Sequence, residues 1–571
     1  MGAQSTGSGR ELRTRVLGAL PVVNHLLARL GLDAILARHL PDDDARYTLA
    51  PATVVGLLVR NLVLHREPVY ALGEWVAPYD PGLLGLAPEQ VALVNDDRVG
   101  RVLDKLFHAD RASLFTEVVL AAVAEFAVDT SELHNDSTSV SFTGAYRGAT
   151  GRPRGGQPTP HITHGHSKDH RPDLKQLVLI LTVAADGAVP VAFRVADGNT
   201  SDDPTHIDTW DHLVALLGRS DFLYVADCKL ANRPAMDHID RGKGRFVTVL
   251  PASRAEDAWF RTWVASHTPA WAEAMRKPGA RTGDPDDVWS VFAAPQPSAE
   301  GYRIVWVHST SLAATNAETR RRRIATTCAA LDDLAGKLAG PKTRYRDTVS
   351  VERAAQAILD THHTNRLIKV HIGQTVDETY RQDNPGRPGP ATRYRRTTRP
   401  RFTLTHTVND DAVTADAASD GCFPLVSNDT TLTNAELLAA YKYQPHLERR
   451  HHQLKGVQLV APVFLKTPAR IEALLACHFL ALLVQALLER EVRTAMRQAQ
   501  LDDIPLYPEL RRCTAPSADR ILEIFTDSLA RHDLHHHGRH IDTFHPELNP
   551  LQRQILKLLG APTKIYTRSG E

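Results

Sequence analysis

The chain has 571 residues, 43% of them hydrophobic, which is enough for two to four domains with sizeable cores. Its formal net charge of +1 lacks the positive excess of many nucleic-acid-binding proteins, so the distribution of charge along the chain is more informative than the sum. No run of 18 apolar residues occurs and the first ten residues lack the apolar stretch of a secretory signal, so we expect neither a membrane span nor an export signal.

Residues 12–128 predict a helical region. Apolar residues recur there at spacings of three and four, as they do on one face of a helix, and prolines separate the helices. The recurring positions include Leu17, Leu20, Val23, Leu27, Val102, Leu103, Leu106 and Phe107. We therefore expect an all-α N-terminal domain over residues 1–128.

The pattern changes from helices to strands after residue 128. The predicted elements, in chain order, are strands at 132–142, 177–183 and 189–195, a helix at 206–217, a strand at 223–225, a helix at 231–242 and a strand at 246–250. Three strands followed by alternating helices and strands is the order of an RNase H-like core, in which helices flank a mixed sheet. We assign residues 129–251 to the first part of this α/β core.

Residues 252–430 have a mixed composition. They include an arginine-rich helix near 313–338 and a loop rich in proline, glycine and arginine at 384–401. We interpret them as a domain inserted in the core. Helices return in residues 431–571, most clearly at 469–496, and we assign this part to the end of the core and to C-terminal helices.

Two aspartates mark the ends of predicted core strands. Asp136 lies inside the alternating segment, and Asp227 ends the apolar run that begins at Tyr224. The two strands are neighbours in the predicted sheet, which would bring both carboxylates together. Because adjacent carboxylates repel, such a pair usually holds a cation. From the pattern alone, the alternative is that each aspartate caps the turn that follows its strand.

Glu448 is the candidate third acid. At helical spacing its face would also carry Tyr441, Gln444 and Lys455. However, Pro445 predicts the start of a new helix, so the shared face is safe only for Glu448 and Lys455. The alternative is an exposed helical glutamate that pairs with the arginines next to it.

The block Tyr441-x2-Gln444-x3-Glu448-x6-Lys455 resembles the signature of DDE transposases from bacterial insertion sequences. That signature reads Tyr, two residues, Arg, three residues, Glu, six residues, Lys. All spacings match, and the departure is Gln444, which brings no charge where arginine is usual. Other segments that resemble this family are 18–24, 96–101, 165–176 and 198–202, so the resemblance spans nearly the whole chain.

The resemblance implies an RNase H-like catalytic core that binds two Mg²⁺ ions, with Mn²⁺ as the alternative, through Asp136, Asp227 and Glu448. It also implies that Tyr441 and Lys455 contact phosphates near the cut, and that the insertion is largely β and handles flanking DNA. The implied activity is metal-dependent cleavage of DNA at the ends of a mobile element, followed by strand transfer into target DNA.

Double-stranded DNA is the partner that this resemblance implies, both as terminal inverted repeats and as target. We expect a homodimer on DNA, in the bacterial cytoplasm with the nucleoid. The N-terminal helical domain is the candidate for reading the repeats, and basic clusters would contact phosphates. Their representatives are Lys168, Arg171, Arg395 and Arg396, together with Gln444 from the signature. No phosphate-binding loop of the G-x-x-x-x-G-K-[ST] type is present, so we expect no nucleotide cofactor.

Two other functions share this acidic triad or its fold. One is an RNase H-like nuclease that cleaves without strand transfer, and the other is an inactive, domesticated copy that only binds DNA. Histidines at 161, 164, 166 and 170 and at 535–537 are weaker zinc candidates by composition. The five cysteines include no Cys-x-x-Cys pair, which predicts reduced thiols and neither a disulfide framework nor a zinc ribbon.

Overall fold

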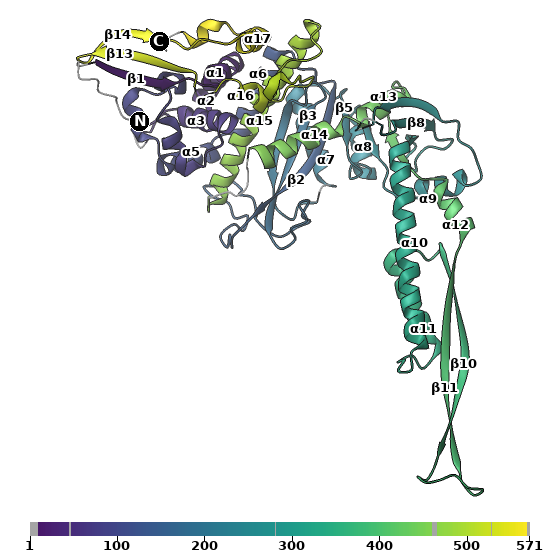
Figure 1. Cartoon of the computed structure of the whole chain (residues 1–571). Coiled ribbons are helices and arrows are strands. Elements are labelled where there is room, and N and C mark those ends of the chain that lie inside the picture. Colours follow the sequence, from purple (N-terminus) through teal and green to yellow (C-terminus); the bar gives the residue numbers. More distant parts are fainter. Residues whose placement is uncertain are drawn as a thin grey trace. The chain divides into compact units, whose positions relative to one another are not determined.

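The computed structural model describes residues 10–44, 47–201, 203–279, 281, 283–458, 465–526 and 528–567. The chain forms two compact units, of which the first combines Met1–Thr248 with Ala440–Glu571 and the second is Val249–Ala439. The second is therefore an insertion in the sequence of the first (Figure 1). Asp202, in one of the family-like segments, and the first nine residues lie outside the described residues.

The N-terminal part of the first unit is helical after a short strand. Its helices are α1 (Leu20–Leu30), α2 (Leu32–His39), α3 (Pro51–Leu64), α4 (Leu72–Val76), α5 (Asp96–His108) and α6 (Arg111–Phe126). Side-chain caps explain two of the starts, since Asn95 accepts from the Arg98 N–H and Asp110 from the Ser113 N–H. The expectation of an all-α region is wrong at its beginning, where β1 (Arg10–Val16) pairs antiparallel with β13 (Ala530–His536).

The central sheet of the first unit is mixed. Its strands are β2 (Glu132–Phe142), β3 (Lys175–Ala184), β4 (Pro190–Ala196), β5 (Leu223–Ala226) and β6 (Arg245–Val249), in the spatial order β4-β3-β2-β5-β6. The first three are antiparallel neighbours, whereas β5 runs parallel to both β2 and β6. The crossover helices are α7 (Thr205–Leu217) and α8 (Arg233–Arg241). The predicted mixed sheet flanked by helices is confirmed.

The longest helix of the first unit, α15 (Pro468–Gln498), forms the centre of its core. It packs against α3, α5 and β4, and most of its side chains are buried. By length and composition it is the one described helix that could cross a membrane, yet 89% of its most apolar window is buried inside the protein. Before it come α14 (Gln444–His452) and a π-helical turn, η4 (Gln453–Val457).

The C-terminal part of the first unit contains both helices and strands. Its elements are α16 (Ala518–Glu523), β13, β14 (Arg539–Phe544) and α17 (Pro550–Leu558). The expectation of helices alone is wrong here, because β13 lies between β1 and β14 in a three-stranded antiparallel sheet. This sheet joins segments more than 500 residues apart in the sequence.

The inserted unit combines sheets with long helices. Its helices are α9 (Ala255–Val264), α10 (Thr310–Ala339), α11 (Thr348–His362) and α12 (Asp410–Ala417), and α13 (Asn434–Tyr441) leads out of it. Its strands are β7 (Ala272–Lys277), β8 (Asp287–Ala293), β9 (Arg303–Ser309), β10 (Ile368–Gln382), β11 (Tyr394–Val408) and β12 (Cys422–Ser427). The expectation of a largely β insertion is wrong, since α10 alone has 30 residues.

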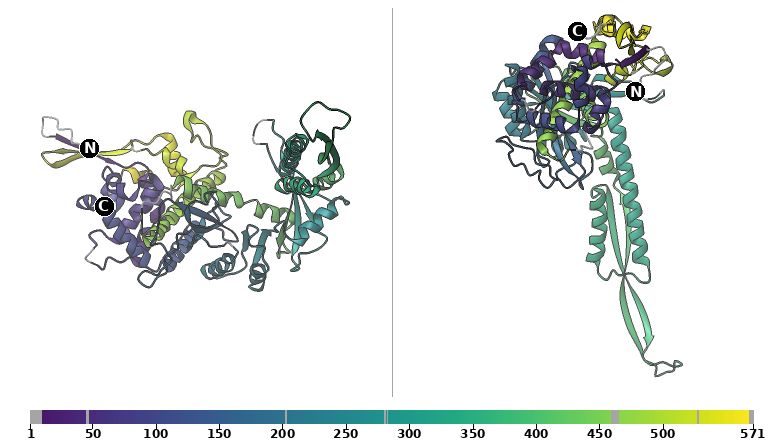
Figure 2. Two further views of the ribbon diagram at one scale, coloured as in Figure 1. Left: turned by 90° about the horizontal axis from the view of Figure 1, so that it is seen from below. Right: turned by 90° about the vertical axis from the view of Figure 1, so that its left-hand side faces the viewer.

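Strands β10 and β11 form a separate two-stranded antiparallel ribbon. Its near half packs against α10 and α11, in a core that includes Leu331, Val351, Leu359, Phe402 and Leu404. Its far half extends beyond these two helices in both views (Figures 1 and 2). The loop expected at 384–401 is therefore wrong in part, because residues from Tyr394 onward belong to β11.

Candidate functional site

Two of the predicted acids lie side by side on neighbouring parallel strands, Asp136 in the middle of β2 and Asp227 directly after β5. The register places Asn135 of β2 opposite Ala226 of β5, so the next residues, Asp136 and Asp227, occupy adjacent positions. Burial and the negative charge of Asp136 raise the pKa of Asp227, while the Lys229 backbone N–H, which donates to its carboxylate, opposes the shift. The negative charge of Asp136 therefore disfavours the ionised form of the partly buried Asp227.

Asp136 is surrounded by polar groups from three segments. Its carboxylate accepts from the Ser137 backbone N–H at 2.8 Å, and Nζ of Lys168 lies 3.4 Å from it. The same ammonium donates to the backbone oxygen of Ser137 at 2.6 Å and to its hydroxyl at 2.7 Å. The loop that carries Lys168 is thus fixed to β2. Lys168, which the sequence predicts as a DNA contact, brings its positive charge next to Asp136.

Glu448 lies on α14, which begins at Gln444 with Pro445 in its first turn, as the proline predicted. Its side chain is exposed. Burial raises the pKa of Tyr441 to about 12, with further contributions from the negative charges of Asp227, Cys228 and Glu448. Tyr441 therefore lies within electrostatic reach of both Asp227 and Glu448 and remains protonated at neutral pH.

The structure brings the two aspartates together but not the whole triad. Among the residues that it describes, no three side chains of Asp, Glu, His or Cys lie close enough to hold one metal ion, and this includes the histidine tracts. Oxygen donors from a pair of like-charged carboxylates are nonetheless the type that Mg²⁺ and Mn²⁺ prefer. The donor chemistry of Asp136 and Asp227 fits a hard divalent ion, and Glu448 would have to approach it to complete the set.

His451 is a site residue that the sequence pattern did not single out. It lies one turn after Glu448 on α14, is 9% exposed, and its Nδ1 is 3.5 Å from the Asp136 carboxylate. Burial, together with the positive charges of Lys168 and Lys455, lowers its pKa to about 3. The ring is therefore neutral, and the contact with Asp136 is polar and not an ion pair. The i, i+3 spacing from Glu448 is the signal that could have identified it.

Lys455 lies in the π-helical turn η4 and pairs with Asp169 at 2.6 Å. Asp169 follows Lys168 in the sequence, so this pair joins the turn after α14 to the loop at Asp136. A single π-helical turn widens the helix by one residue and is common at functional sites. It also changes the angular relation between Glu448 and Lys455 that a regular helix would give.

The other predicted DNA contacts lie in different surroundings. Arg171 pairs with Asp173 at 2.7 Å on the surface, so its charge is balanced locally. Gln444 is the first residue of α14 and is partly buried. Arg395 and Arg396 belong to β11 in the inserted unit, where they pair with Asp383 and Glu378.

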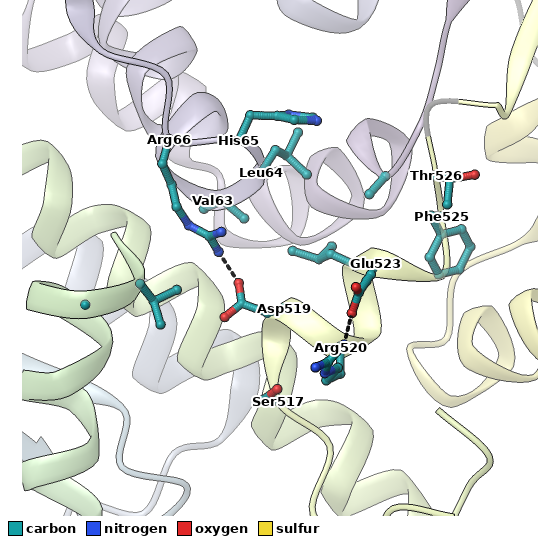
Figure 3. Close-up of a pocket in the computed structure, with 14 residues that line it drawn as sticks. Val63, Leu64, His65, Arg66, Ser517, Asp519, Arg520, Glu523, Phe525 and Thr526 are labelled. Atoms are coloured by element: carbon teal, nitrogen blue, oxygen red, sulfur yellow. Dashed lines mark hydrogen bonds and ion pairs between the residues drawn. The ribbon is translucent and has the colours of Figure 1, made fainter. Parts of the chain in front are cut away.

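A cavity of about 770 Å³ lies elsewhere in the first unit and includes none of the predicted acids (Figure 3). Its charged side chains pair with each other, Arg66 with Asp519 and Arg520 with Glu523. Gly456 of η4 contributes to its wall. The charged side chains of this cavity therefore balance one another.

Comparisons with known proteins find a family model and six chains of solved structures that resemble the chain. Residues 12–120 match a domain of unknown function, DUF4277. No curated protein sequence matches the chain. A cryo-EM structure of the piggyBac transposase synaptic complex with hairpin DNA is similar at 11% identity, with a TM-score of 0.24. That match covers 51% of this chain and 59% of the other.

Proposed function

We propose that the protein is a transposase, which cleaves DNA at the ends of a mobile element and joins those ends to target DNA. The observation that carries the proposal is the adjacency of Asp136, in the middle of β2, and Asp227, directly after the parallel strand β5. The strand order β4-β3-β2-β5-β6 supports the RNase H-like core that the sequence predicts. The signature around Glu448 supplies the third acid.

The proposed metal ligands are Asp136, Asp227 and Glu448, with Mg²⁺ as the ion and Mn²⁺ as the alternative. Repulsion between the two aspartates supports this assignment, because a cation would relieve it. When bound, a divalent ion supplies Lewis-acid stabilisation of the charge that develops on the scissile phosphate.

The chain's own residues would bind and orient that phosphate. Lys168 and Lys455 bring two ammonium groups to the loop beside Asp136, and each can exchange its present partner for a phosphate oxygen. Tyr441, protonated because its pKa is about 12, can donate a hydrogen bond to another oxygen. Neutral His451 limits the orientations of the Asp136 carboxylate without adding charge.

We also propose the DNA partners, the oligomeric state and the cellular location of the protein. The N-terminal helices would read the terminal inverted repeats, and a homodimer would hold two DNA ends in the bacterial cytoplasm. Gln444, Arg171, Arg395 and Arg396 would add contacts to DNA. These assignments follow from the resemblance in sequence and from the chemistry of the side chains.

The test uses a labelled duplex that carries the end of the element, with Mg²⁺ or with EDTA. We expect the wild type to cut only with metal, and Asp227→Asn and Glu448→Gln to lose at least about 100-fold in rate, because each removes a charged ligand. Asp208→Asn is the matched control, since Asp208 is an exposed acid that pairs with Arg194 on the surface of the same unit. Cutting that survives both ligand substitutions would contradict the proposed site.

A pre-cleaved duplex with a free 3′-hydroxyl separates transposition from simple hydrolysis. Joining of this end to a second DNA supports a transposase. Cleavage of the intact end without joining would instead identify an RNase H-like nuclease. Binding without either reaction would identify a DNA-binding protein.

A further inference from the structure

The far half of the β10–β11 ribbon, residues 375–401, has no covering element on either side. Residues 375–381 and 394–399 are all exposed, including Val376, Tyr380 and Tyr394, which are 56%, 61% and 50% exposed. We call this segment the distal ribbon. An isolated two-stranded hairpin is marginally stable in water, so a ribbon of this length gains from contact with a partner.

The charge of the distal ribbon is strongly one-sided. It contains seven arginines, no lysine and three acidic residues, which gives a formal net charge of +4. Each acid has an arginine partner, namely Asp377 with Arg401, Glu378 with Arg396 and Asp383 with Arg395. Within the described part of the chain, the other four arginines have no acidic partner; they are Arg381, Arg387, Arg393 and Arg399. The ribbon therefore offers four uncompensated guanidinium groups.

The register separates these side chains onto two faces. Directly opposed residues of an antiparallel pair point to the same side, and Arg381 is opposite Arg395 while Asp377 is opposite Arg399. One side, the arginine face, carries Arg381, Arg395, Arg399 and Arg401, together with Asp377, Thr379 and Thr397. The other side, the tyrosine face, carries Val376, Glu378, Tyr380, Tyr394, Arg396 and Pro400.

We propose that the distal ribbon is a DNA-binding arm whose arginine face contacts the phosphate backbone of duplex DNA, independently of base sequence. This inference deepens the proposed function and rests on it for the identity of the partner. Guanidinium groups bind phosphate oxygens through two parallel hydrogen bonds, and the threonine hydroxyls between them can donate to the same backbone.

The dimensions of the ribbon suit a duplex. Arg399 lies at the level of Asp377, four residues along the ribbon from the Arg381–Arg395 pair, which is about 13 Å at the rise of a strand. The major groove of B-DNA is about 12 Å wide and admits a two-stranded ribbon. Arginines at these two levels can therefore reach phosphates on either side of one groove.

The ribbon is fixed to its unit at the base of this surface. Arg401 donates to the backbone oxygens of Ala339 and Gly340 at the end of α10, at 3.0 and 3.1 Å. These carbonyls have no partner within the helix, and a cation there is favourable. The base of the distal ribbon is thus fixed to the end of α10 by hydrogen bonds.

The experiment measures binding of the full chain to a fluorescein-labelled 30-base-pair duplex of arbitrary sequence, by anisotropy, in EDTA. We expect Arg399→Gln to raise Kd about three- to tenfold, and Arg381→Gln with Arg399→Gln to reduce the slope of log K against log salt by about 2. Arg353→Gln is the matched control. Arg353 is an exposed arginine of α11 in the same unit, so its replacement removes the same charge away from the ribbon, and we expect less than a twofold change.

Three results would overturn the arm. They are unchanged binding by the double variant, equal losses for Arg353→Gln and Arg399→Gln, or a changed sedimentation mass of the free double variant in place of a changed DNA affinity. The last would make the ribbon a contact between copies of the chain. Because EDTA prevents metal-dependent cleavage, the binding assay tests the arm without testing the proposed enzyme activity. An arm that binds while no metal-dependent cutting occurs would leave this inference standing.

Discussion

At the scale of single residues, the site shows a balance between repulsion and fixed polar contacts. Asp227 is partly buried next to Asp136, and both burial and that neighbouring charge disfavour its ionised form. Lys168 and the Ser137 N–H compensate Asp136 on its other side. The ionised Asp227 carboxylate therefore lowers the stability of the folded state at this position, as is common at functional sites.

Neutralising Asp227 should stabilise the protein. A carboxyl whose pKa is raised on folding lowers stability once the pH exceeds its ordinary value near 4, and the penalty is complete above the folded pKa. We expect Asp227→Asn to raise Tm by roughly 2–4 °C at pH 7.5 in EDTA, and this gain to vanish near pH 4. Calorimetry at both pH values measures it. Asp208→Asn, at an exposed position, is the control, and a Tm for Asp227→Asn below the wild-type value at pH 7.5 would contradict the repulsion.

Added Mg²⁺ should stabilise the wild type but not a variant that lacks one of the two aspartates. In the wild type, Mg²⁺ in excess of its Kd stabilises the folded state by mass action, by about 2.7 kcal/mol at 100 times Kd. We expect Tm of the wild type to rise with Mg²⁺ and that of Asp136→Asn to stay within about 1 °C of its value in EDTA. Equal rises in both proteins would show that the ion binds elsewhere.

At the scale of elements, one buried arginine holds helix α14 in place. Arg450 pairs with Glu489 of α15 at 2.9 Å and donates to the backbone oxygens of Gly187 and Ala188 in the turn between β3 and β4. Both charged side chains are almost fully buried. The helix that carries Glu448 is thus connected to the sheet and to the central helix by a single side chain.

Removal of this side chain should be costly. Arg450→Met leaves the buried Glu489 with the longer ion pair to Arg493 at 3.4 Å and the hydrogen bond from the Ala518 N–H, and breaking a buried pair costs about 3–5 kcal/mol. The neighbouring exposed Arg449 is the control, since Arg449→Met loses no such pair. Urea unfolding of the two variants compares them. Equal midpoints would mean that Arg450 does not anchor α14.

Helix α15 also predicts a pH dependence. Burial lowers the pKa of His478 to about 3, so between pH 6.5 and 3 the unfolded chain binds a proton that the folded chain does not. Stability conferred by the neutral ring is complete above pH 6.5 and falls as the pH decreases, by up to about 1.4 kcal/mol per unit. We expect His478→Gln to reduce this slope between pH 6 and 4.5, as measured by urea unfolding. An unchanged slope would place the acid sensitivity at another group, such as His451.

At the scale of the whole molecule, the inserted unit has its own core. The side chains that join α10, α11 and the near half of the ribbon include Leu334, Leu338, Ala355 and Ile368. None of this core comes from the distal ribbon. Binding by the arm and folding of the unit can therefore be separated.

Shortening the ribbon should leave the fold intact. Replacing residues 376–400 by Asn-Gly joins Thr375 to Arg401 with a two-residue turn that suits an antiparallel pair. We expect Tm to change by less than about 2 °C, because no buried apolar side chain is removed, while duplex affinity falls more than for the double arginine variant. Loss of the folded state would show that the distal ribbon stabilises the unit.

The core strands and the two aspartates could be predicted because their signals are local. Alternation over residues 132–142 and the apolar run before Asp227 are short patterns, and a parallel neighbour relation then brings the aspartates together. Strand β1 could not be predicted in this way. Its residues are mostly charged, and its partner β13 lies more than 500 residues away.

The ribbon and His451 were missed for different reasons. Arginine, threonine and proline around residue 396 indicate a loop when read alone, and only pairing with β10 makes a strand of them. His451 is neutral because burial, together with the positive charges of Lys168 and Lys455, lowers its pKa, and both the burial and Lys168 come from other segments. Such properties of the surroundings have no signal in the sequence next to the residue.

The division of the first unit by the insertion has a consequence during synthesis. Asp136 and Asp227 leave the ribosome well before Glu448, because residues 249–439 are made in between. Strand β1 must likewise wait for β13, and the backbone oxygen of Gly18 must wait for the hydroxyl of Tyr566, which donates to it. A nascent chain that stops before α14 therefore carries two of the acids without the third. Under the proposed function, a product interrupted within the insertion would lack the third acid and so could not cut the DNA near which it is made.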